Sequence, residues 1–157
     1  MGYDIVSMVP MFCEVFLGES EVEGGLAFPK RIAREVLDYS LESLHAVDRY
    51  LDYLHAHADE IEDQEYTNTI LAAGCYLGEV IRRCAPVDYQ WVNYDDYFPH
   101  HPKLAKMVPE GVGTGAVLVA ATGAMTMPLN KIARYIGEGS ENNTHFYATA
   151  EVRPQKR

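Results

Sequence analysis

The sequence predicts an α+β protein in which long amphipathic helices pack on one face of a small antiparallel sheet. Two patterns support this: apolar residues recur every three or four positions early in the chain, and they alternate with polar residues later. The length of 157 residues, with 48% hydrophobic and 23% charged side chains, is typical of one folded domain. We therefore expect a single domain over 1–157, with a loosely attached segment over 1–28 and a disordered tail over 153–157.

The strongest helical pattern begins at Pro29, a residue that suits the first turn of a helix. Apolar residues then recur at helical spacing from Ala33 to Leu54, with charged residues between them. This pattern predicts a helix of about seven turns. The acidic residues over 55–65 repel one another, which favours a solvated helix end or loop there.

A second helix is predicted from Thr67 or Asn68, either of which can cap it, to about Arg83. Gly74 and Gly78 lie one turn apart within it. Each glycine costs roughly 1 kcal/mol relative to alanine in a helix interior. We therefore expect another element to approach the backbone of this helix closely at both glycines.

The rest of the chain is predicted from shorter patterns. Residues 3–17 fit either a short helix that begins near Pro10 or a pair of strands. The other expected elements are a strand over 89–94, a long connection over 98–115, a strand over 116–121, a helix over 128–136 and a last strand over 144–152.

The net charge of −10 is distributed unevenly along the chain. Residues 1–65 contain 15 acidic and 4 basic side chains, hence −11, whereas residues 66–157 contain 8 acidic and 9 basic ones, hence +1. A negative field repels nucleic-acid phosphates and anionic membranes and attracts basic proteins. The alternative is that the acidic residues only maintain solubility.

The sequence also bears on location. It has no apolar run of about 18 residues, which a membrane helix requires. It has no signal-peptide pattern, and its three cysteines follow neither a zinc nor a disulfide spacing. We therefore expect a cytoplasmic protein.

Several short stretches of the chain resemble a known type of protein. They are Leu41-Glu-Ser-Leu44, Tyr76-Leu77-Gly78-Glu79-Val80-Ile81, Trp91, and Pro128 with Lys131 before a glycine-bounded helix end. This set resembles small uncharacterised bacterial proteins, domains of unknown function that pair a long helix with a Gly-Glu helix and a short sheet. The resemblance covers residues 36–150 and implies a bacterial cytosolic α+β domain. It brings no established activity, so no functional residue is carried over.

The leading functional hypothesis is a non-catalytic acidic domain that binds a basic protein partner, either as an immunity or antitoxin-type inhibitor or as an adaptor. Aromatic side chains supply contact area at interfaces, and neighbouring carboxylates select a basic partner. The predicted partner-binding residues are Trp91, Tyr94, Asp95, Asp96, Tyr97 and Phe98, together with Asp59, Glu60, Glu62 and Asp63. The alternative for the aromatic residues is the inner face of a sheet followed by a turn.

A second hypothesis is a small enzyme or ligand-binding domain with a cleft between the long helix and the sheet. It requires Asp48, Glu79 or the pair His100 and His101 to converge on one pocket. The alternative is that Asp48 and Glu79 are paired structural charges, Glu79 with the arginines three and four residues later. The sequence contains no catalytic motif, which favours a protein that is not an enzyme.

We also expect no metal site and no cofactor. His55 and His57 point about 200° apart on a helix and cannot share one ion. A homodimer through the aromatic strand is a third hypothesis.

Overall fold

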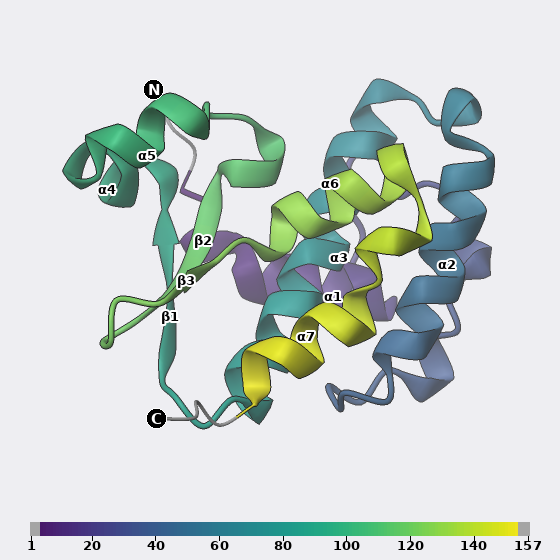
Figure 1. The fold of residues 1–157 in the computed structure, drawn as a ribbon. Coiled ribbons are helices and arrows are strands. Elements are labelled where there is room, and N and C mark those ends of the chain that lie inside the picture. Colours follow the sequence, from purple (N-terminus) through teal and green to yellow (C-terminus); the bar gives the residue numbers. More distant parts are fainter. Residues whose placement is uncertain (1–3, 154–157) are drawn as a thin grey trace.

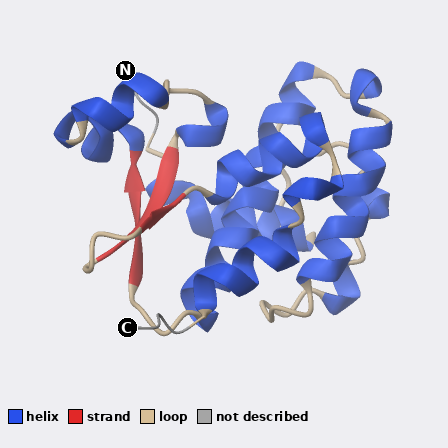
Figure 2. Cartoon of the chain, in the orientation of Figure 1, coloured by secondary structure: helices blue, strands red, loops and turns tan. Residues whose placement is uncertain are grey.

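The computed structural model describes residues 4–153, which form seven α-helices and a three-stranded antiparallel sheet (Figures 1 and 2). The predicted α+β class is therefore confirmed. The helices are α1 (Val9–Leu17), α2 (Leu44–Ala56), α3 (Asp63–Cys84), α4 (Tyr94–Tyr97), α5 (Pro102–Met107), α6 (Pro128–Glu138) and α7 (Thr144–Val152). The strands are β1 (Tyr89–Asn93), β2 (Ala116–Ala120) and β3 (Met125–Thr126).

Helix α3 forms the centre of the molecule. It packs against α1, α6 and α7, and α2 packs on the outer side of α6 and α7. Figure 1 shows α2 on one side of this group, and the sheet with α4 and α5 on the other. The middle of α3 is buried on nearly every side, because neighbours surround it. Every residue from 72 to 78 is buried, and these residues are apolar or small apart from the Tyr76 hydroxyl, as expected for a core helix.

The two glycines of α3 mark close contacts with neighbouring elements, as the sequence predicted. A Cβ atom on Gly74 would lie 2.8 Å from Cα of Leu129 in α6. A Cβ atom on Gly78 would overlap the ring of Trp91 in β1. Glycine thus lets α6 and the sheet approach the α3 backbone directly.

The sheet has the strand order β1-β2-β3, with both pairs antiparallel. Tyr89 pairs with Ala120 and Trp91 with Leu118, so these four side chains share one face. All four belong to the main core or pack against it, so this is the face of the sheet that packs on the helices. The predicted strands over 89–94 and 116–121 are confirmed, whereas the two-residue strand β3 was not predicted.

The predicted seven-turn helix over 29–54 is wrong in its first half, since α2 begins only at Leu44. Residues 29–43 form two single 3₁₀ turns and bends. Tyr39 adopts a left-handed conformation (φ 66°), and its N–H donates to the Tyr76 hydroxyl at 3.0 Å. The apolar side chains of this segment contact the core without forming a helix: Ile32 is buried in the core, and Leu37 packs against it.

Helix α3 is confirmed but begins at Asp63, earlier than predicted. Glu62 and Glu65 form a capping box, in which each side chain accepts a hydrogen bond from the backbone N–H of the other residue. Of the two predicted alternatives for these carboxylates, a solvated helix end or a loop, the first describes Glu62, Asp63 and Glu65, which lie at the start of α3. Carboxylates are favourable at this helix end because they face its positive dipole.

The predicted last strand over 144–152 is a helix, α7. Its alternating apolar residues suggested a strand, but two side chains supply hydrogen-bond acceptors to its first turn. Asn143 accepts from the backbone N–H of Phe146 at 2.9 Å, and Asp48 accepts from that of Thr144 at 2.7 Å. Only the second contact joins distant parts of the chain, so the sequence pattern did not reveal it.

Residues 1–28 were predicted to be loosely attached, but this does not hold for α1, which lies within them. Pro10 lies in the first turn of α1, as one sequence alternative predicted, and α1 packs against α3. Phe12, Val15 and Phe16 are buried, Phe16 completely. The predicted disordered tail, 153–157, lies outside the described residues except for Arg153. No helix within 4–153 is long and apolar enough to span a membrane.

Candidate functional site

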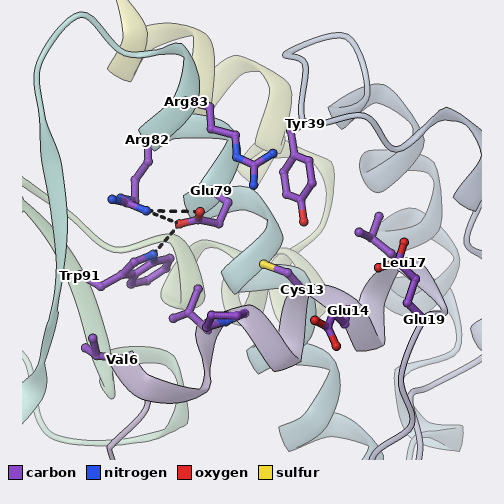
Figure 3. A pocket seen from close by; sticks show the side chains of 12 residues that line it. Val6, Cys13, Glu14, Leu17, Glu19, Tyr39, Glu79, Arg82, Arg83 and Trp91 are labelled. Carbon is purple, nitrogen blue, oxygen red and sulfur yellow. Dashed lines mark hydrogen bonds and ion pairs between the residues drawn. The ribbon is translucent and has the colours of Figure 1, made fainter.

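A cleft of about 560 Å³ opens between α1, α3, β1 and the segment that precedes α2 (Figure 3). We call it the α1–α3 cleft. Its polar and aromatic lining residues include Cys13, Tyr39, Glu79, Arg82, Arg83 and Trp91. These side chains come from four separate segments, which only the fold brings together.

Glu79 is held at one wall of the α1–α3 cleft by two donors. Nη1 of Arg82 lies 3.0 Å and 3.3 Å from its two oxygens, and Nε1 of Trp91 donates at 2.8 Å. Nε of Arg82 also donates to the Tyr89 carbonyl, which ties this ion pair to β1. The expected structural pairing of Glu79 is confirmed for Arg82.

Arg83 does not pair with Glu79. Its guanidinium lies 3.6 Å from the centre of the Tyr39 ring (Figure 3). The Tyr39 ring stacks in turn on Tyr76. No carboxylate within residues 4–153 lies at ion-pair distance from Arg83. An exposed guanidinium in this position is available to a planar anion such as a carboxylate.

Two groups in the α1–α3 cleft are held in their neutral forms. Burial raises the pKa of the Cys13 thiol to about 12, and the charge of Glu79 adds to this shift. Burial likewise raises the pKa of Tyr39 above its ordinary value, and the neighbouring Cys13 adds to that shift. Cys13 is therefore not an activated nucleophile, because only a thiolate attacks.

Tyr39 carries the backbone strain of the α1–α3 cleft. Its left-handed conformation (φ 66°) costs a bulky residue about 1–3 kcal/mol. Strain of this kind is found more often at binding sites than elsewhere. It favours a role for the Tyr39 ring in the cleft beyond packing.

Asp48 is buried, with 5% of its surface exposed, and is not among the residues that line the α1–α3 cleft. It accepts hydrogen bonds from the N–H of Thr144 at 2.7 Å, the hydroxyl of Thr144 at 2.6 Å and the N–H of His145 at 3.2 Å. Burial raises the pKa of Asp48, although these hydrogen bonds oppose the shift. The partners are helix-end donors rather than a basic side chain, so Asp48 caps α7 from α2.

The alternative catalytic residues do not converge. Glu79 lies in the α1–α3 cleft, Asp48 lies between α2 and α7, and His100 and His101 are exposed beside α5. Figure 1 shows α5 and α2 on opposite sides of the molecule. The arrangement that an enzyme built on these residues requires is therefore not present in the described part of the chain.

The predicted aromatic partner-binding residues lie mostly inward. Phe98 is 1% exposed, stacks on Tyr94 at 4.3 Å and contacts the edge of Tyr97 at 5.1 Å. Trp91 packs on α3, with its N–H bonded to Glu79. The prediction of a contact surface is therefore wrong for Phe98. Tyr94 and Tyr97 are half-buried, and beside them the two aspartates of α4 remain exposed.

The second group of predicted partner-binding residues is exposed. Asp59 and Glu60 lie in the 3₁₀ turn after α2, and Glu62 and Asp63 begin α3. Glu62 has a structural task in the capping box, whereas the other three have no hydrogen bond or ion pair from their side chains among residues 4–153. Figure 1 shows that the turn between α2 and α3, where these residues lie, and α4 are on opposite sides of the molecule, so the two groups do not form one surface.

Residues 34–63, which include α2 and its flanking turns, lie opposite the sheet in Figure 1, and we call their exposed carboxylates the acidic side. They are Glu35, Asp38, Glu42, Asp52, Asp59, Glu60, Glu62 and Asp63. Within residues 4–153 the only ionic contact of these groups is between Glu42 and His45, at 3.8 Å. Two nearby arginines contact other groups: Arg34 donates to the Phe16 carbonyl at 3.0 Å, and the guanidinium of Arg31 lies 4.1 Å from the centre of the Tyr53 ring.

The chain was compared with protein families, curated proteins and solved structures, and none of these comparisons gives a significant match. The resemblance to bacterial domains of unknown function therefore stays a prediction, and function has to be argued from the chemistry of the chain itself.

Sequence reasoning missed Cys13, Tyr39 and Arg83 as lining residues of one cleft. Their positions depend on how α1 and the segment before α2 pack against α3, which no local pattern encodes. It also missed a meeting of His45 with His145, whose rings stack at 4.0 Å although they lie 100 residues apart. The left-handed Tyr39 had no signal in the sequence, because glycine and asparagine are the residues that usually mark that conformation.

Proposed function

We propose that this protein is a non-catalytic, cytoplasmic binding protein whose acidic side engages a basic protein partner, as an inhibitor of the immunity or antitoxin type or as an adaptor. One observation carries the proposal: the carboxylates of the acidic side are exposed, and within residues 4–153 only Glu42 makes an ion pair. Unneutralised charges of one sign produce a field that extends about 8–10 Å into physiological salt.

The distribution of charge supports this choice of partner. Of the 15 acidic side chains in residues 1–65, all but Asp48 and Glu65 are exposed. Charges clustered in this way repel one another, which costs stability. A basic surface would relieve the repulsion on binding and would accelerate association.

The test compares two variants with the same net charge. The first replaces four carboxylates of the acidic side by amides, and the second replaces four carboxylates on the side of the sheet. Each raises the net charge from −10 to −6. The first set is Glu35, Asp59, Glu60 and Asp63, and the second is Asp88, Asp95, Asp96 and Glu110.

Partners are captured from lysate at low salt, identified by mass spectrometry, purified and titrated against each variant. The first variant should bind the partner about tenfold or more weakly, and the second should bind like the wild type. Binding of the wild type should also weaken as salt rises. A partner whose affinity depends on neither salt nor the first variant would refute the proposal. Loss of affinity in the second variant alone would assign binding to the carboxylates on the side of the sheet instead.

A second candidate function is the binding of a small anionic ligand in the α1–α3 cleft, favoured by Arg83 and the strained Tyr39 beside it. The chain contains one tryptophan, Trp91, so its fluorescence reports on this cleft alone. Titration with small aromatic carboxylates should change that signal in the wild type and not in Arg83→Gln. Arg49→Gln, which removes an exposed arginine outside the cleft, should behave like the wild type. Equal titrations for all three proteins would exclude this function.

The homodimer hypothesis concerns β1, which is an edge strand of the sheet. Edge strands offer unpaired backbone groups to a second chain. Molar mass measured by light scattering at two protein concentrations tests it: a mass of 17.6 kDa at both would exclude the dimer.

A further inference from the structure

Three metal-capable side chains meet where the start of α2 faces the start of α7. We propose that Glu42, His45 and His145 bind a transition-metal dication of the zinc class. The site shares Glu42 with the acidic side, but the inference does not rest on the function proposed for that side, because it concerns coordination by specific atoms rather than a diffuse field.

The ligand atoms of the three residues all lie within 4.8 Å of one another. Nε2 of His45 is 3.8 Å from a carboxylate oxygen of Glu42, three residues earlier. The rings of His45 and His145 have centroids 4.0 Å apart and planes inclined by 23°. Two ligand atoms bound at about 2.0–2.2 Å in a tetrahedral site lie roughly 3.3–3.6 Å apart, so the three side chains have to close by about 1 Å to hold one ion.

The backbone around His145 is fixed by buried contacts. Asp48, three residues after His45 on α2, accepts hydrogen bonds from the N–H groups of Thr144 and His145. Asn143 accepts from the N–H of Phe146 and so caps the same turn. The first turn of α7 is thereby attached to α2, which holds the two histidines next to each other.

The donor set determines which ion is favoured. Two imidazole nitrogens and one carboxylate oxygen suit zinc and neighbouring dications, whereas calcium and magnesium prefer oxygen ligands alone. Three protein ligands leave a fourth position for water. Because the two rings are nearly parallel, one of them must rotate so that both nitrogens point at one ion. The side chain of His45 is 51% exposed, so it is free to rotate.

Stacked imidazoles beside a carboxylate also occur without a metal, so binding has to be measured. Zinc is titrated by calorimetry into full-length protein that carries Cys84→Ser, because Cys84 is an exposed thiol and itself a zinc ligand. One zinc ion per chain is expected. Loss of groups that only support metal ligands weakens metal affinity about 10–100-fold, so loss of a ligand should cost at least about tenfold.

Glu42→Gln and His145→Ala are the test variants. Glu42 is 84% exposed, so its replacement leaves the fold intact even if His145→Ala loosens α7. The matched control is the double variant His100→Ala, His101→Ala, which removes two exposed imidazoles elsewhere. Cobalt gives a second readout, since its visible spectrum reports nitrogen and oxygen coordination and should change in Glu42→Gln.

The expected result is at least a tenfold loss of zinc affinity in Glu42→Gln and none in the control. Three results would overturn the proposal: no zinc binding by the parent protein, equal binding by the parent and Glu42→Gln, or an equal loss in the His100 and His101 control.

Discussion

Replacing Gly74 by alanine tests the closest backbone contact in the core. Gly74 is buried in α3, where α6 crosses it. The new Cβ atom would lie 2.8 Å from Cα of Leu129 and 2.9 Å from two of its side-chain atoms. The side chain can rotate away, but Cα can move only if α6 shifts as a unit.

Two effects of opposite sign determine the magnitude. Alanine favours the helix by roughly 1 kcal/mol relative to glycine. Overpacking a well-packed core costs about 1–3 kcal/mol, and the backbone contact places this site at the upper end. The free energy of unfolding should therefore fall by about 1–2 kcal/mol. For a chain of this size that corresponds to a Tm lower by about 2–8 °C.

Gly137 provides the matched control. It lies in α6, is exposed, and a Cβ atom built on it would have no neighbour within 4 Å. Gly137→Ala should therefore gain up to about 1 kcal/mol from helix propensity alone. Replacing glycine by alanine should thus lower the free energy of unfolding at Gly74 and raise it at Gly137.

Urea unfolding followed by circular dichroism measures both variants, with an unchanged m-value as the condition for comparing their stabilities. If Gly74→Ala were as stable as the wild type, or more stable, the reasoning would be refuted. Such a result would mean that the α3 backbone at Gly74 does not lie directly against Leu129 of α6.

Three further predictions concern buried groups. Asp48→Ala leaves two N–H groups at the start of α7 without their acceptor. The free energy of unfolding should fall by about 3 kcal/mol, and the helical circular dichroism should decrease as α7 frays. Unchanged urea unfolding would contradict the capping role of Asp48. In the native protein a thiol reagent at pH 8 should label Cys84 and leave Cys13 unmodified. The pKa of about 12 of Cys13 leaves only about one Cys13 thiol in ten thousand ionised at that pH. Mass spectrometry of peptides identifies the labelled site. Gly78→Ala should displace the ring of Trp91, and a tryptophan emission maximum equal to that of the wild type would contradict the contact.

The fold could be predicted best where the chain carries dense local information. Helix α3 has a sustained apolar stripe, and its two glycines signalled the neighbours that the structure places there. Pro128 and the following apolar spacing located α6, and alternation located β1 and β2. In these segments local preference and burial agree, so a pattern along the chain is sufficient.

The failures occur where distant residues change the local preference. Residues 29–43 have helical spacing, yet they fold into turns because Tyr39 is held by Tyr76. Residues 144–152 alternate like a strand, yet they form a helix because Asp48 supplies acceptors from α2. A sequence pattern contains neither contact.

Composition and local patterns along the chain were enough to predict the acidic character of the first 65 residues, the α+β class and the central helix with its close contacts. Tertiary packing alone buries Phe98, places Arg83 and Tyr39 in one cleft and brings His45 against His145. A binding site depends on distances between segments that are far apart in sequence, and those distances are fixed by packing of the whole chain rather than by the preference of any one segment.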